Sequence, residues 1–381
     1  MKKILIALSG IAFLIGALWY ALHHKMIIIN LSGFTEYSVE KPSRRKVPIV
    51  WFNDGLHTQT ENTEVLWTSF PSENTASVIT AWLQMLQEEA IIDKRIKIDR
   101  LFITPLHHEI FVNFSRNPLD ASWSLAKKWT IIESLLLTLQ KTFPELKALR
   151  LLEQNKPLVD RDIDCSASFI LAPHMTAYPT PREHRQPLRT IVIHPHGDKQ
   201  TTGRVVARAF ERTITRTLAQ TLKESLESMG ICRVYITHEL GQTIDQEQAA
   251  TYANRLNADL YLAITAFENK KAAPEIESFF ALYDPATDFW QKKETALALL
   301  PITKTFLRNC TISYALGTEL TKNLRAEADQ QLFINPLYGL PLQELIGVNT
   351  PGLVIEVGIQ QQEQIVHVAQ VIAQATRKII F

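Results

Sequence analysis

Hydrophobic and polar positions divide the 381-residue chain into three regions. The first is an uncharged apolar run from Ile4 to Leu22. The second covers about residues 45–173 and the third residues 189–381, and in both of them short apolar runs alternate with segments of helical period. A proline-rich stretch from Leu171 to Arg189 lies between them and has the composition of a linker. The pattern therefore predicts two folded domains behind an apolar N-terminal segment.

The apolar N-terminal run is preceded by Lys2 and Lys3. Its length is close to the roughly 20 residues that a membrane-spanning helix needs, and the lysines favour a cytoplasmic N-terminus. A cleaved signal peptide is the alternative, but no convincing small-x-small cleavage site follows. We expect residues 1–24 to be a single-pass anchor or signal segment at the cytoplasmic membrane. The bulk of the chain would then face the periplasm or the cell exterior.

The second region alternates between strand and helix patterns. An apolar strand is predicted at Val47–Phe52, and helices are predicted at Ala76–Ala90 and Ser122–Phe143, where apolar residues recur with helical spacing. Further strands are predicted over the stretches RLFIT, EIFVNFS and LKALRLLEQ. This order predicts a small α+β domain.

The third region repeats strands and helices along its whole length. A long helix is predicted from Val206 to Leu226, where apolar residues recur every fourth position, and near-continuous apolar runs such as GLVIEVGI predict buried strands. Buried strands between helices indicate a mostly parallel sheet with helices on both faces, an α/β fold. In such sheets, functional residues lie at the carboxyl ends of the strands.

Composition excludes some classes of function. The net charge of +1 argues against a nucleic-acid-binding protein, which would normally carry a marked basic excess. The three cysteines are far apart and form no CxxC pair, so they support neither a zinc knuckle nor a disulfide framework.

The candidate chemistry of the third region comes from two histidines and two glutamates. His194 and His196 follow the strand IVI, Glu211 comes early in the next helix, and Glu356 interrupts the final apolar strand. Imidazole and carboxylate groups are common zinc ligands, and a carboxylate near a zinc-bound water can act as a general base. The alternative is a surface loop with two solvated histidines and a glutamate neutralised by a nearby cation.

Motifs in residues 190–381 resemble the zinc-dependent N-acetylmuramoyl-L-alanine amidases that carry a DPGHGG motif. The stretch IVIHPHGDK resembles IVIDPGHGG, FER resembles the glutamate motif of the next helix, and TPGLVIEVGIQQQEQ resembles PAVLVELGFISNPEE. The resemblance implies that His196 and Glu211 are zinc ligands and that Glu356 is the catalytic glutamate. It also implies hydrolysis of the amide between N-acetylmuramic acid and the L-alanine of the stem peptide.

One departure from the family pattern affects the implied zinc site. The third ligand, a histidine in the family's SIHAN motif, corresponds to Thr265 in the stretch AITAF. His194 could replace it, since residues two apart on an extended chain point the same way, and His238 is a weaker substitute. Alternatively, the site has lost hydrolysis and the domain is a peptidoglycan-binding or regulatory scaffold.

Residues 45–173 resemble the GerMN-type domain that is fused to some cell-wall amidases. The stretches that carry the resemblance are KVPIVWFND, HHEIFVNFS and DIDCSASF, together with the helix around ESLLLTLQ. Such domains are regarded as interaction modules, and no cluster of catalytic residue types occurs in this one. Together with the anchor expected at residues 1–24, the two resemblances imply a membrane-anchored peptidoglycan hydrolase of wall remodelling or division. Zn²⁺ would be its cofactor, peptidoglycan its substrate, and an activator or division protein a possible partner.

Overall fold

The computed structural model describes residues 42–52, 58–104, 109–171, 190–228, 230, 232–283, 306–307 and 309–380. The predicted anchor at residues 1–24 lies outside this part of the chain, and so does most of the predicted linker. Among the described residues, no helix has both the length and the apolar character to traverse a bilayer. Residues Ser43–Phe381 form one compact unit.

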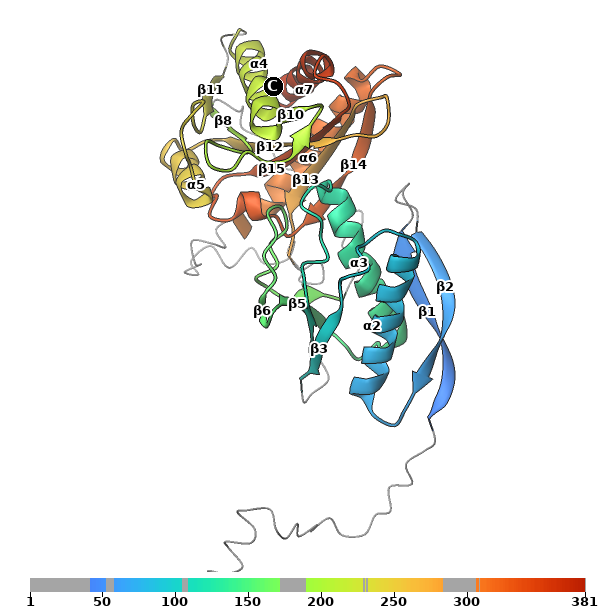
Figure 1. Cartoon of the computed structure of the whole chain (residues 1–381). Coiled ribbons are helices and arrows are strands. Elements are labelled where there is room, and N and C mark those ends of the chain that lie inside the picture. The colour runs from blue at the N-terminus through green and yellow to red at the C-terminus, as the bar shows by residue number, and fades with distance from the viewer. Residues whose placement is uncertain are drawn as a thin grey trace, which may run out of the picture. The chain divides into compact units, whose positions relative to one another are not determined.

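The first half of this unit is an α+β arrangement, as predicted (Figure 1). Its strands are β1 (Ser43–Phe52), β2 (Thr58–Trp67), β3 (Ile98–Ile103), β4 (Glu109–Phe114), β5 (Ala148–Glu153), β6 (Lys156–Pro157) and β7 (Phe169–Ile170). Its helices are α2 (Pro71–Glu88) and α3 (Leu125–Thr142). β1 and β2 form an antiparallel hairpin, while β3 to β7 form a separate sheet in which β4 and β5 are parallel.

The helix α3 begins and packs as its sequence dictates. The Ser124 side chain caps it by accepting a hydrogen bond from the backbone N–H of Lys127. Its apolar residues, among them Trp129, Ile132 and Leu135, are fully buried. The first backbone N–H groups of a helix have no partner within the helix, and that of Leu125 donates to the Glu356 carboxylate of the second half at 2.7 Å.

The second half contains a six-stranded sheet of order β11-β8-β12-β15-β13-β14. Its strands are β8 (Thr190–Pro195), β11 (Arg233–Ile236), β12 (Leu260–Glu268), β13 (Glu275–Ala281), β14 (Phe333–Leu340) and β15 (Gly352–Ile359). Its helices are α4 (Glu211–Glu227), α5 (Gln246–Arg255), α6 (Cys310–Glu327), α7 (Gln364–Ile380) and a 3₁₀ turn, η3, at Gln343–Leu345. Neighbouring strands are parallel except for β13 against β15, so the mostly parallel sheet is confirmed.

The two faces of this sheet are covered differently. Alternate residues such as Ile193, Leu262 and Ile355 belong to a core that includes α4, α6 and α7. Residues of the opposite face, such as Val192 and Ala263, belong to a core that includes α5 and the apolar residues of the first half. We predicted helices on both faces, whereas the first half of the chain covers much of the second face.

The prediction that a helix begins at Val206 was wrong. Residues 205–210 form a short hairpin of β9 (Val205–Val206) and β10 (Ala209–Phe210), and α4 begins at Glu211. Ala207 and Arg208 turn the hairpin with positive φ angles of 48° and 64°, as two-residue hairpin turns require. The result is that Glu211 becomes the first residue of its helix.

Candidate functional site

Polar side chains from four adjacent strands form a row across one face of the sheet. His196 follows β8, and its backbone N–H donates to the carbonyl of Ile264 on β12 at 2.8 Å. Thr265 is the register partner of Glu356 on β15, and Glu356 is the register partner of Glu277 on β13. Register partners on neighbouring strands point to the same face. This is the face that the first half of the chain covers.

Glu211, the predicted second zinc ligand, has both carboxylate oxygens occupied. Oε1 accepts a hydrogen bond from the backbone N–H of Ala266 at 2.9 Å, and Oε2 accepts one from Arg204 N at 2.8 Å and another from Arg161 Nη1 at 2.7 Å. The residue is fully buried. Burial by itself would raise the pKa of this carboxyl, but the positive charges of His196, Arg161 and Arg204 outweigh it and lower the pKa. Glu211 is therefore a buried carboxylate neutralised by arginines.

Glu356, the predicted catalytic glutamate, is also engaged on both oxygens. Arg204 Nη1 donates to Oε1 at 2.6 Å, and the backbone N–H of Leu125, the first residue of α3, donates to Oε2 at 2.7 Å. The same guanidinium donates through Nη2 to Asp162 at 2.6 Å. Arg204 thus lies at the centre of the site, while Leu125 and Asp162 reach it from the first half of the chain.

Glu277 adds a second carboxyl beside Glu356. It is buried, and burial together with the negative charge of Glu356 raises its pKa well above the ordinary value. Asn335 Nδ2 donates to its Oε1 at 3.0 Å. Burial raises the pKa of Glu356 as well, so the two neighbouring buried carboxyls favour holding a proton between them over both being ionised.

The two predicted histidines face the same group, as their spacing suggested, but that group is the carboxylate of Glu344 on η3. His196 Nδ1 donates to Glu344 Oε1 at 2.6 Å, and His194 Nε2 lies 3.5 Å from Oε2. His194 Nδ1 lies 2.8 Å from the Thr237 hydroxyl, and burial lowers its pKa to about 4. Burial also opposes charge on His196, but the Glu344 carboxylate outweighs it and raises the pKa. His196 is therefore the more readily charged of the two rings.

These residues do not fit the zinc ion that the family resemblance implies. Thr265 offers only a hydroxyl at the third position, both oxygens of Glu211 are hydrogen-bonded, and His196 Nδ1 is bonded to Glu344. His196 Nε2 is buried without a hydrogen-bond partner among the described residues, and so is Oε2 of Glu344, a residue that the resemblance does not assign to the zinc site. Across the described chain, no group of three or more His, Cys, Asp or Glu side chains is arranged to hold a metal ion. The charge that neutralises Glu356 is the guanidinium of Arg204 and not a metal ion.

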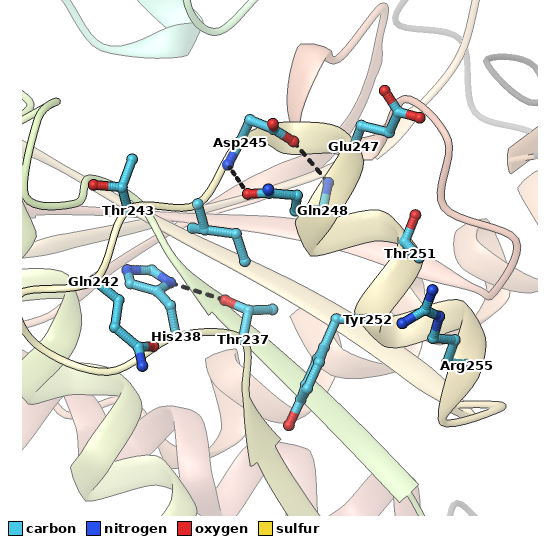
Figure 2. A pocket seen from close by; sticks show the side chains of 11 residues that line it. Thr237, His238, Gln242, Thr243, Asp245, Glu247, Gln248, Thr251, Tyr252 and Arg255 are labelled. Atoms are coloured by element: carbon cyan, nitrogen blue, oxygen red, sulfur yellow. Dashed lines mark hydrogen bonds between the residues drawn. The ribbon is translucent and has the colours of Figure 1, made fainter.

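An open polar pocket of about 810 Å³ lies beside this site, between the end of β11 and the start of α5 (Figure 2). Thr237 and His238 form one wall, and their side chains are hydrogen-bonded to each other at 3.0 Å. Tyr252 and Arg255 line it from α5, which the Asp245 side chain caps. Because Thr237 also contacts His194, the pocket connects to the buried site through one hydroxyl group.

Sequence reasoning missed the residues that fill the site, chiefly Arg204, Glu344, Arg161 and Asp162. Arg204 precedes a hairpin and shows no periodic pattern, and Glu344 lies on a single 3₁₀ turn. The run DRDID around Arg161 was the one available signal, because alternating charges between apolar residues are costly to bury without partners. Nothing in the sequence indicates that those partners lie on the far half of the chain.

Comparison with known protein families gives a match in the second half of the chain. Residues 191–375, slightly less than half of the chain, match the family model described as N-acetylmuramoyl-L-alanine amidase. The match falls on the stretch whose motifs resemble that family. No curated protein matches the chain in sequence.

Solved structures of amidases are similar to about half of the chain. An N-acetylmuramoyl-L-alanine amidase from Clostridium difficile 630 has 16% identity and a TM-score of 0.36, with 51% of this chain and 95% of that chain covered. The catalytic domain of CwlV from Bacillus (Paenibacillus) polymyxa var. colistinus has 15% identity and a TM-score of 0.34, with 50% and 97% covered. The CwlD amidase from Clostridioides difficile, in complex with the GerS lipoprotein, has 13% identity and a TM-score of 0.32, with 50% and 97% covered. Scores this low carry no functional argument.

Proposed function

We propose that this chain is a peptidoglycan-binding or regulatory scaffold built on an amidase-family domain, and that it does not hydrolyse the wall. The family match of residues 191–375 supports peptidoglycan as the partner. One observation carries the loss of hydrolysis: the Arg204 guanidinium is bonded to Glu356 at 2.6 Å, where the family needs a free catalytic carboxylate beside a cation. A general base in this mechanism must be free to accept a proton from water.

The electrostatics support the same conclusion. The Arg204 side chain is 2% exposed and Glu356 is fully buried, so the pair is shielded from water. Removing one partner of such a pair leaves an uncompensated buried charge, which costs about 3–5 kcal/mol. Displacement of Arg204 by a metal ion would also have to overcome its bond to Asp162. The site therefore favours the guanidinium over a weakly held cation.

The pocket at β11 and α5 is our proposed place of contact with the wall. Threonine and glutamine side chains make up about half of its lining, beside Asp245, Glu247 and Arg255, and the Tyr252 ring is half-buried there. Hydroxyl and amide groups around an aromatic ring suit an uncharged, hydroxyl-rich ligand such as the glycan part of peptidoglycan.

A second candidate function, zinc-dependent cleavage of the N-acetylmuramoyl-L-alanine amide, is favoured by the family match and by the proximity of Glu211 and His196, which interact electrostatically. It requires Arg204 to leave Glu356. Four further expectations belong to both candidate functions. They are a membrane anchor at residues 1–24, a GerMN-like domain at residues 45–173, a domain boundary at residue 189, and an activating division protein as partner.

The test uses the full chain, purified in mild detergent and mixed with purified peptidoglycan sacculi and zinc. We expect the chain to sediment with the sacculi without releasing soluble fragments or new N-terminal alanine amines. Tyr252→Ala should weaken sedimentation several-fold, whereas Tyr235→Ala, on β11 and outside the pocket lining, should not. Release of fragments by the wild-type chain that Glu356→Gln abolishes would refute the proposal and establish the hydrolase.

A further inference from the structure

The segment Asp160–Asp164 of the first half lies along the second half as a bound peptide would. The backbone N–H of Asp164 donates to the carbonyl of Pro341 at 2.9 Å, and the backbone N–H of Gln343 donates to the carbonyl of Asp162 at 3.1 Å. Ile163 and Leu342 form an antiparallel bridge between these two bonds. Pairing through main-chain groups is how extended peptides bind an open strand edge.

Side chains of the same segment reach the polar groups of the amidase-family site. Arg161 donates to Glu211 at 2.7 Å, and Asp162 accepts from Arg204 at 2.6 Å. The Tyr283 hydroxyl donates to Asp164 at 2.7 Å. The adjacent residues Arg161 and Asp162 are thus paired with groups of opposite charge on the second half, Glu211 and Arg204.

The first half holds this segment in its extended form. Lys128 Nζ on α3 bonds Asp160 at 2.8 Å and Asp162 at 2.7 Å. The Asp160 carboxylate also accepts the backbone N–H groups of Asp162 and Ile163 at 2.9 and 3.0 Å. Because its own half already orders the segment, little entropy is lost when it meets the site.

From these contacts we infer that Asp160–Asp164 is an internal ligand of the amidase-family domain, and that displacing it opens a groove along Pro341–Gln343 for an extended peptide with adjacent basic and acidic side chains. The groove supplies main-chain partners, the Glu211 carboxylate and the Arg204 guanidinium. The inference rests on the proposed function only in treating the domain as a binding module. It states which surface binds, which chemistry is recognised, and what occupies that surface now.

Hydrogen exchange measured by mass spectrometry on the full chain in detergent tests this inference. In the double variant Arg161→Gln/Asp162→Asn, amides of residues 159–165 and 341–345 should exchange at least about tenfold faster than in the wild type. Amides of β12 and β15 should keep their protection, which shows that the domain remains folded. The matched control is Asp99→Asn/Arg100→Gln, an exposed acid–base pair on β3, and it should change neither stretch.

Binding of a probe completes the test. A fluorescein-labelled peptide with the sequence of residues 158–166 should bind the Arg161→Gln/Asp162→Asn variant at least about tenfold more tightly than the wild type, because its site is no longer occupied in cis. Unchanged exchange, or equal binding of the peptide to both proteins, would overturn the inference. So would loss of protection throughout the domain, because the segment would then be part of the core. Zinc-dependent wall hydrolysis would refute the proposed function but would not alter these readouts.

Discussion

At the scale of single residues, the site is defined by which cation neutralises each buried carboxylate. Arg204 forms hydrogen-bonded ion pairs with Glu356 and Asp162, and Arg161 forms one with Glu211. Guanidinium groups suit such positions because they stay charged and offer several donors in a fixed plane. The two arginines thus occupy both carboxylates that the family resemblance assigns to the zinc site, Arg161 the predicted ligand Glu211 and Arg204 the predicted catalytic Glu356.

Substituting Arg204 tests how much this residue contributes to the free energy of unfolding. Arg204→Met should lower the free energy of unfolding by about 3–5 kcal/mol, because Glu356 loses its charged partner in a buried site. The measurement is the urea midpoint of the full chain. Arg100→Met, at an exposed position on β3, should change it by less than about 0.5 kcal/mol. A similarly small effect for Arg204→Met would mean that Arg204 and Glu356 are not paired in solution.

Sequence reasoning found part of the site because motif positions are local and charge partners are not. His196, Glu211 and Glu356 were identified from short motifs; the structure places His196 and Glu356 on one face of the sheet and Glu211 at the start of α4. Arg161 and Arg204 could not be identified as their partners, since such a pairing depends on how the two halves of the chain pack. Thr265 stands where the family motif has a histidine, and this was the one local sign that the site differs from the family's zinc site.

At the scale of elements, the strands and helices followed hydrophobic patterning where both faces or one stripe were buried. β12 and β15 are mostly apolar and almost wholly buried and were predicted, whereas β2, a largely exposed strand rich in polar residues, was not. Edge strands carry weak patterns because only part of their surface is buried. The same limit applies to β14 at the sheet edge.

Helix α3 provides a test of pH dependence through Glu133. Burial raises the pKa of this carboxyl from 4.5 to about 7. The folded chain therefore keeps a proton that the unfolded chain loses, and stability falls as the pH rises from 4.5 to 7. Glu133→Gln should remove this loss, so it should raise the free energy of unfolding by up to about 3 kcal/mol at pH 8 and by little at pH 5.

Urea midpoints of the wild type and Glu133→Gln at the two pH values measure this difference. Glu145→Gln is the control, because this glutamate is exposed in the turn after α3. A gain that is equal at both pH values would show that Glu133 is not held protonated.

The N-terminus of helix α5 offers a test of N-capping. Asp245 accepts a hydrogen bond from the backbone N–H of Gln248, whose side chain in turn bonds the Asp245 backbone N–H (Figure 2). Asp245→Ala should lower the free energy of unfolding by about 1 kcal/mol, measured by thermal denaturation. Asp99→Ala on β3 is the control, and an equal loss in both variants would contradict a capping role.

At the scale of the whole molecule, the two halves of the described chain share both apolar and charged contacts. One hydrophobic core includes residues of α3, such as Trp129, together with Tyr261 and Val354 from the six-stranded sheet. The charged contacts through Arg161 and Asp162 lie beside it. We expected two independent domains on grounds of length, and their boundaries at residues 173 and 189 remain a prediction. Composition could not reveal that the halves complete one site.

The most direct measurement of this account is a crystal structure of the chain grown with zinc, with anomalous data collected at the zinc absorption edge. We expect density for the Arg204 guanidinium between Glu356 and Asp162, and no anomalous peak at His196 and Glu211. An anomalous peak held by His196 and Glu211, with Arg204 turned away from Glu356, would contradict the account.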